Sequence, residues 1–200
     1  MDRRAFLLGA PALLAACSTK PRVFAPQEAV DAAYSANTGP TEISVFTVFN
    51  VGSNNGAHSA LFIRSDQNIL FDPAGTFEHE TLPERHDVIY GMRREARRAY
   101  VDYHTRITYW SAMQTAQVSP ATAAWLQREA EQAGPVPDAL CARVLSGMLE
   151  RAPGLPFQVK QTWFPNKIHD QLLGQPGITR QEFRQQDADD NSNFWDTATL

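Results

Sequence analysis

The sequence contains very little cysteine: only Cys17 and Cys141 occur in a chain of 200 residues. Basic residues are also in the minority, with 18 Lys and Arg against 22 Asp and Glu and a formal net charge of -4. Proteins that bind nucleic acids need clustered basic residues to contact phosphates, so we expect no nucleic-acid partner. No internal repeat or low-complexity tract is visible, and a single domain of ordinary soluble composition accounts for the length.

The N-terminal apolar run, 5–16, is too short to span a bilayer, which takes about 20 residues. It follows the basic start MDRR and ends in the tetrad Leu14-Ala15-Ala16-Cys17. This tetrad resembles a bacterial lipobox, in which small residues precede a cysteine that is diacylated on sulfur. We therefore expect residues 1–16 to be a lipoprotein signal peptide and Cys17 to be the lipidated mature N-terminus.

These features predict a place in the bacterial cell envelope. Lipid chains on Cys17 would anchor the protein to the membrane with its domain facing the periplasm. Ser18 follows that cysteine, which resembles sorting to the outer membrane. The pair Arg3-Arg4 also resembles a twin-arginine export motif, so export by this route or by the general secretory route stays open.

Hydrophobic patterning and turn residues divide the mature chain into three parts. Residues 17–40, rich in Pro, Ala, Ser and Thr, are predicted to be a tether with a short helix near 27–34. Residues 41–178 form the domain, and 179–200 form a polar tail. The domain pattern predicts an α+β fold with strands at 43–51, 58–64, 68–72, 87–92 and 106–118, and helices at 120–133, 139–151 and 165–173. We assign no other element to the charged segment 76–103.

Cys141 is the first candidate for chemistry. If Cys17 carries lipid, Cys141 is left unpaired in an oxidising compartment, where cysteines usually form disulfides. With Asp138 as N-cap, Cys141 falls in the first turn of the predicted helix 139–151, where the helix dipole and free N–H groups lower a thiol pKa. The alternative is that Cys141, between Leu140 and Ala142, is a small buried hydrophobe.

His58 is the candidate general base for this thiol. It begins an apolar strand after a Gly-rich turn, whereas His79, His86, His104 and His169 are expected to be solvated. Asp72 ends the next strand, and in an antiparallel hairpin the start of one strand lies beside the end of the next. His58 and Asp72 are therefore predicted neighbours, although Asp72 is also a common turn residue before Pro73. A metal site of His58, Asp72 and His79 is a further reading, but its spacing fits no standard ligand pattern.

The order of these residues resembles a known family. Gly56-Ala57-His58-Ser59-Ala60 at a strand start, then Asp72, then Cys141 at a helix start are similar to the circularly permuted papain-like cysteine proteins of the NlpC/P60 superfamily. The resemblance covers about 43–174 and implies a small antiparallel sheet packed against helices. It also implies a cysteine acyl-enzyme, with no metal and no organic cofactor.

Together these features predict a membrane-anchored thiol hydrolase or acyltransferase acting on peptidoglycan peptides or on lipid acyl or amide bonds. Cys141 would be the nucleophile, His58 the acid and base, and Asp72 the group that orients His58. The alternative is a non-catalytic envelope lipoprotein that binds a partner or a cell-wall fragment. Leu140, where many members of the family have asparagine before the cysteine, favours this alternative.

Overall fold

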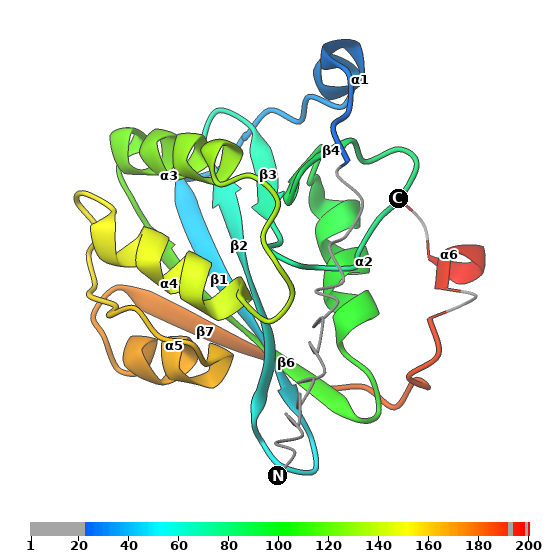
Figure 1. Cartoon of the computed structure of the whole chain (residues 1–200), viewed down its shortest axis with the longest axis vertical. Coiled ribbons are helices and arrows are strands. Elements are labelled where there is room, and N and C mark those ends of the chain that lie inside the picture. The colour runs from blue at the N-terminus through cyan, green and yellow to red at the C-terminus, as the bar shows by residue number, and fades with distance from the viewer. Residues whose placement is uncertain (1–22, 192–193, 199) are drawn as a thin grey trace, which may run out of the picture.

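The structure, a computed structural model, describes residues 23–191, 194–198 and 200 (Figure 1). The predicted signal peptide and the predicted lipidation site Cys17 lie outside these residues. In chain order the elements are α1 (Gln27–Ala32), β1 (Glu42–Asn50), β2 (Gly56–Arg64), β3 (Asn68–Phe71), β4 (Glu84–Arg85), β5 (Val88–Tyr90), α2 (Arg94–His104), β6 (Tyr109–Gln117), α3 (Pro120–Gln132), α4 (Cys141–Arg151), α5 (Pro165–Leu172), β7 (Ile178–Phe183) and α6 (Phe194–Thr197). Among the described residues, no helix has the length and apolar character needed to cross a membrane.

The strands form one seven-stranded antiparallel sheet in the order β4-β5-β3-β2-β1-β6-β7. The predicted meander is confirmed: β2 pairs with β1 on one side and with β3 on the other. The continuous apolar character of these strands is explained by burial on both faces of the sheet. The fold is therefore α+β, as the sequence predicts.

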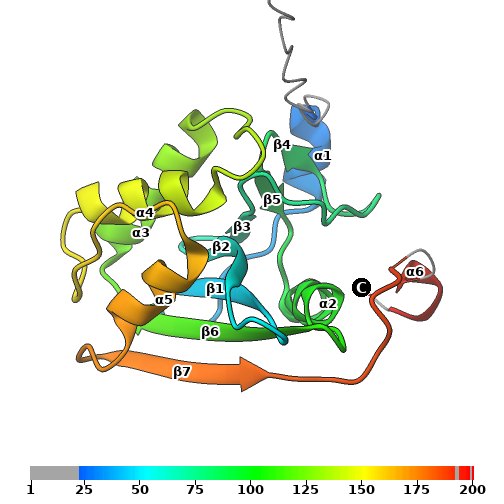
Figure 2. The same cartoon turned by 60° about the horizontal axis from the view of Figure 1, so that its bottom comes forward.

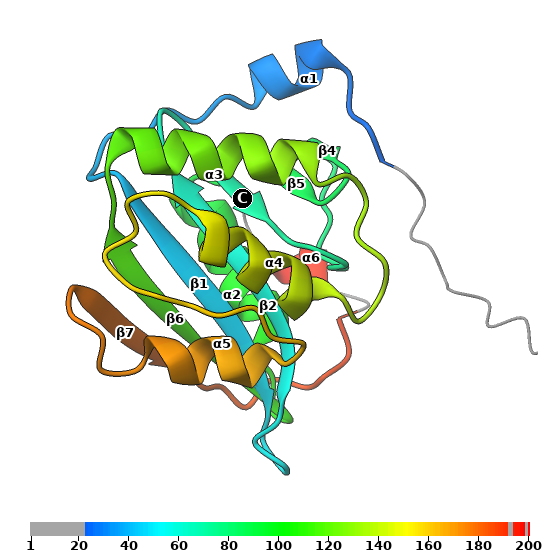
Figure 3. The same ribbon diagram turned by 60° about the vertical axis from the view of Figure 1, so that its left-hand side comes forward.

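Helices cover both faces of this sheet (Figure 2). Successive residues of a strand point to opposite faces, so Val45 and Leu61 pack into one core with α3, α4 and α5. Phe46 and Phe62 pack into a second core on the other face, with α2 and Phe194 of α6. Figure 3 shows α3, α4 and α5 lying across β1 and β2 on the first face. Strands β1 and β2 therefore lie between two cores, each covered by its own helices.

Local signals explain two of the predicted helices. The side chain of Ser119 accepts a hydrogen bond from the N–H of Thr122 at 3.0 Å, and Pro120 takes the first position of α3. Pro165 likewise begins α5. The predicted cap of the next helix is wrong, however. Ala139 has a φ of +64°, outside the helical region, so α4 begins later, at Cys141, and Asp138 is an exposed residue before it.

Three further differences concern segments that the sequence left as loop, tether or tail. The charged segment 76–103 contains most of α2, whose buried residues Ala96, Ala99 and Tyr100 recur at helical spacing. Residues 179–183, predicted as the start of a polar tail, belong to the edge strand β7 (178–183), which pairs with β6. In the predicted tether, the short helix expected near 27–34 is confirmed as α1, and the difference is that its Val30 is buried against the first core.

Candidate active site

The site lies where β3 ends beside β2. The pairing of β3 with β2 stops at Leu61 and Phe71, so the first half of β2 extends beyond its neighbour. Asp72, the next residue along the chain, is buried and its N–H donates to the carbonyl of Asp87 at 2.8 Å. This opening in the sheet is where helices from both faces can approach the His58 side chain.

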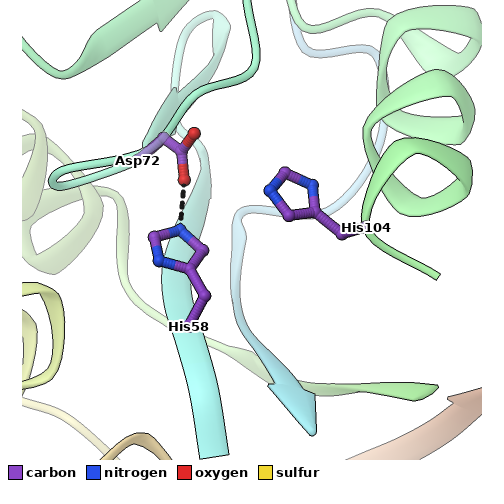
Figure 4. Close-up of side chains that lie close together, drawn as sticks. All are labelled: His58, Asp72 and His104. Carbon is purple, nitrogen blue, oxygen red and sulfur yellow. Dashed lines mark hydrogen bonds and ion pairs between the residues drawn. The ribbon is translucent and has the colours of Figure 1, made fainter. Parts of the chain in front are cut away.

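His58 and Asp72 meet as predicted (Figure 4). Nε2 of His58 lies 2.6 Å from Oδ1 of Asp72. The His58 side chain keeps 15% of its surface exposed, whereas that of Asp72 keeps 2%. The same Oδ1 accepts a second hydrogen bond, at 2.6 Å, from the hydroxyl of Tyr100 on α2. One carboxylate oxygen therefore fixes both a histidine ring from the sheet and a tyrosine from a helix.

Cys141 approaches His58 from the face of the sheet covered by α3, α4 and α5, whereas Tyr100 of α2 lies on the other face. It is the first residue of α4, so its thiol lies at the helix N-terminus, whose N–H groups have no intrahelical acceptor. The thiol interacts with the His58 ring and with the backbone of Ser59 and Ala142. Because Nε2 of His58 is held by Asp72, Nδ1 is the ring nitrogen left for the thiol. Cys141 is buried and belongs to the first core, so it packs against apolar side chains as well as contacting His58.

The pKa values of this pair move in opposite directions. Burial alone lowers the pKa of His58, but Asp72 and the Cys141 thiolate outweigh it and raise the pKa to about 10. Burial alone raises the pKa of the Cys141 thiol, but the His58 ring and the two backbone groups lower it below its usual value of 9.0. Both shifts favour the charged form of the pair, a thiolate facing an imidazolium, over the neutral thiol and imidazole.

Asp72 is held in its charged form by the groups around it. Burial disfavours the carboxylate and raises its pKa, but His58 and the Tyr100 hydroxyl more than compensate, and the net pKa is lowered. Burial and the adjacent Asp72 charge keep the pKa of Tyr100 well above 10.0, so its hydroxyl stays a donor. Gly75 makes room for this carboxylate, since an added Cβ there would lie only 1.8 Å from Oδ2 of Asp72.

His104 is a neighbour of the site that the sequence did not predict. Its ring lies 5.6 Å from that of His58 between centroids, with an angle of 12° between the planes. Burial lowers the pKa of His104 to about 4, so this ring is neutral, and its Nδ1 donates to the carbonyl of Tyr100 at 3.0 Å. The expectation that His104 is solvated is wrong, because it ends α2 one turn after Tyr100. The helical spacing of apolar residues in 94–104 was the signal that could have placed both residues.

The remaining histidines lie elsewhere. Nδ1 of His79 contacts the Thr81 hydroxyl at 2.8 Å, in a segment outside the site. His169 is buried rather than solvated as predicted, and its Nε2 accepts a hydrogen bond from Arg180 of β7 at 3.0 Å. A strand that was predicted as tail thus covers this histidine, which explains why its burial was missed.

One set of potential metal ligands occurs among the described residues. His58, Asp72 and His104 each offer a ligand atom, and these atoms all lie within 4.8 Å of one another. The third member is His104, so the sequence-based reading of a metal site with His79 named the wrong histidine.

Comparison of the chain with models of protein families, with curated proteins and with solved structures finds no match. The site itself is therefore the basis for assigning a function.

Proposed function

We propose that the protein is a thiol hydrolase or acyltransferase that cleaves amide or ester bonds through an acyl-enzyme on Cys141. The observation that carries this proposal is the position of His58 between Cys141 and Asp72. A nucleophile, an acid and base, and a group that orients the base are the three roles that acyl transfer requires.

Each residue has a defined part in the proposed reaction. The Cys141 thiolate attacks the carbonyl carbon, and N–H groups at the start of α4 donate to the oxygen that becomes negative. The His58 imidazolium then gives its proton to the leaving nitrogen or oxygen, and the thioester remains on Cys141. Neutral His58 next removes a proton from water, or from an acceptor amine or hydroxyl, which displaces the acyl group and regenerates the thiol pair.

The architecture and cellular place are part of the same proposal. The chain order His58, Asp72, Cys141 and the antiparallel sheet between helices support a circularly permuted papain-like fold. The tetrad ending at Cys17 supports a lipid anchor in the bacterial envelope with the domain facing the periplasm. Substrates within reach of such an anchor are peptidoglycan peptides and the acyl or amide bonds of lipids.

Covalent labelling of Cys141 tests the proposal. The full chain with Cys17→Ser leaves Cys141 as the only thiol, and it is incubated with an activated ester or amide probe and analysed by mass spectrometry. We expect one acyl adduct on the peptide containing Cys141. We expect no adduct in the Cys141→Ala protein and at least about 100-fold slower labelling in the His58→Ala protein, since general acid–base catalysis contributes about 10²–10⁴-fold. Equal labelling of the parent chain and the His58→Ala chain would exclude the proposed role of His58.

A non-catalytic binding role is the second candidate. The observation in its favour is the burial of Cys141, which retains 6% of its surface exposed. The same labelling experiment separates the two candidates, because a binding module needs no thiol that acylates faster than free cysteine.

A further inference from the structure

We propose that His58, Asp72 and His104 form a binding site for Zn²⁺, and that bound Zn²⁺ switches off the Cys141 thiol. The binding part of this proposal is independent of the proposed function, whereas the inhibition part rests on it.

The first support is the chemistry and position of the three ligands. Two imidazoles and one carboxylate are donors that Zn²⁺ accepts in proteins, and the three ligand atoms lie within 4.8 Å of one another. Figure 4 shows one nitrogen of His104 facing the space beside Asp72 and Nε2 of His58. They come from β2, from the residue after β3 and from the last residue of α2, so three separate elements converge on one point.

The second support is the set of hydrogen bonds around the ligands. A histidine that binds a metal typically donates its other ring N–H to a carbonyl or carboxylate, and a bound carboxylate is itself hydrogen-bonded. Nδ1 of His104 donates to the Tyr100 carbonyl, which leaves Nε2 as the ligand atom. The Tyr100 hydroxyl donates to Asp72. One residue of α2 therefore orients two of the three ligands.

Binding requires the release of the proton on Nε2 of His58 and a small rearrangement of the ligands. Bonds of about 2.0–2.2 Å in a tetrahedral Zn²⁺ site place ligand atoms roughly 3.3–3.6 Å apart. His104 therefore has to move inward by about an ångström, and the 2.6 Å contact between His58 and Asp72 has to open. A fourth position is left for water, because Cys141 interacts with the other side of the His58 ring.

The consequence for the thiol follows from the proton count at His58. A ring nitrogen that binds a metal cannot also carry a proton, so with Zn²⁺ on Nε2 the His58 ring holds one proton, on Nδ1, and cannot become an imidazolium. The Nδ1 proton of a metal-bound imidazole is much less acidic than a proton of an imidazolium, and the ring cannot accept a second proton, so His58 can no longer give a proton to the leaving group and take one back from water. Zinc would thus act on the thiol through His58 without binding the sulfur.

Zinc affinity is measured by competition with a chromogenic chelator, in full chains carrying Cys17→Ser and Cys141→Ser so that no thiol can bind the metal. We expect one Zn²⁺ per chain, and a loss of affinity of at least about tenfold in His104→Phe, which keeps an aromatic ring and removes the ligand nitrogen. The matched control His79→Phe removes a histidine outside the cluster and should bind as the parent chain does. Equal zinc affinity of the His104→Phe and parent chains, or no binding by the parent, would overturn the proposal.

Inhibition is measured as the ratio of Cys141 labelling rates with and without Zn²⁺, in chains carrying only Cys17→Ser. We expect a decrease of at least about tenfold in the parent chain at saturating Zn²⁺ and no decrease in the His104→Phe chain at the same concentration. Equal inhibition of both chains would mean that zinc binds the thiol directly, and would refute the His104 site. If the metal-free parent chain does not label, the proposed function fails while the affinity measurement still decides the zinc site.

Discussion

Replacing Gly75 with alanine should disable the site by displacing the Asp72 carboxylate, although no catalytic residue is substituted. An ideal Cβ at Gly75 would lie 1.8 Å from Oδ2 of Asp72, 2.2 Å from Cγ and 2.6 Å from Oδ1. Ordinary contacts of a Cβ begin near 3.4 Å, so the carboxylate has to retreat by more than 1 Å: about 1.6 Å at Oδ2 and about 1.2 Å at Cγ. A displacement of this size is large compared with the tolerance of a hydrogen bond, so we expect the 2.6 Å contact with His58 to be lost.

The expected effect of Gly75→Ala is a loss of about 100-fold in the acylation rate of Cys141, because displacement of a catalytic group by about 1 Å costs this much. This corresponds to about 2.7 kcal/mol of transition-state stabilisation. The rate is measured by stopped-flow labelling with the ester probe, and circular dichroism verifies the fold. Gly52→Ala is the matched control, since a Cβ there meets no atom closer than 3.4 Å. A Gly75→Ala chain that acylates at the parent rate would refute the role of Asp72 in orienting His58.

Two further perturbations test the electrostatics and the stability of the site. The rate of acylation by the ester probe should rise through a thiol pKa below 9.0 and fall as His58 deprotonates near pH 10, and a profile that climbs to a plateau above pH 10 would contradict the pairing. The folded-state pKa of His58 lies above its unfolded value of 6.5, so the stabilisation it provides is complete below about pH 6.5 and is lost as the pH rises through about 10. This loss is measured as a urea midpoint that falls more in the parent chain than in His58→Ala. Tyr100→Phe removes a buried hydroxyl from the Asp72 carboxylate and should lower the free energy of unfolding by about 1–3 kcal/mol, measured by urea denaturation. Tyr34→Phe, at an exposed hydroxyl 3.3 Å from a carbonyl, should change it by less than about 0.5 kcal/mol, and equal effects of the two variants would contradict this reasoning.

The sequence was informative where local signals and the final fold agree. Strands β1, β2 and β3 have β-branched and aromatic residues between clear turns, so their order and antiparallel pairing followed directly. The contact of His58 with Asp72 followed from that pairing, because hairpin geometry fixes which strand ends are neighbours.

Predictions failed where charge concealed a buried face. Helix α2 carries five charged side chains in eleven residues, and the narrow stripe formed by Ala96, Ala99 and Tyr100 was not recognised. Because α2 was missed, Tyr100 and His104 could not be placed beside Asp72. The polar residues of β7 hid an edge strand for a related reason: four of its six side chains are exposed.

The start of α4 shows a different limit. Asp138 is a residue type that often caps helices, but the cap position is occupied by Leu140, whose side chain makes no capping hydrogen bond. The left-handed backbone of Ala139 precedes it, and alanine gives no sequence signal for such a conformation. The prediction that Cys141 lies in the first helical turn nevertheless holds, because its place depends on the helix and not on the capping residue.

The thiol pKa of Cys141 tests the pairing with His58 most directly. It is measured from the ultraviolet absorbance of the thiolate as a function of pH, in the full chain with Cys17→Ser and in the same chain with His58→Ala. The expected result is a pKa below 9.0 in the first chain and a higher value in the second, because the imidazolium is removed. An unchanged pKa in the His58→Ala chain, or a pKa above 9.0 in the parent chain, would contradict the thiolate–imidazolium pair.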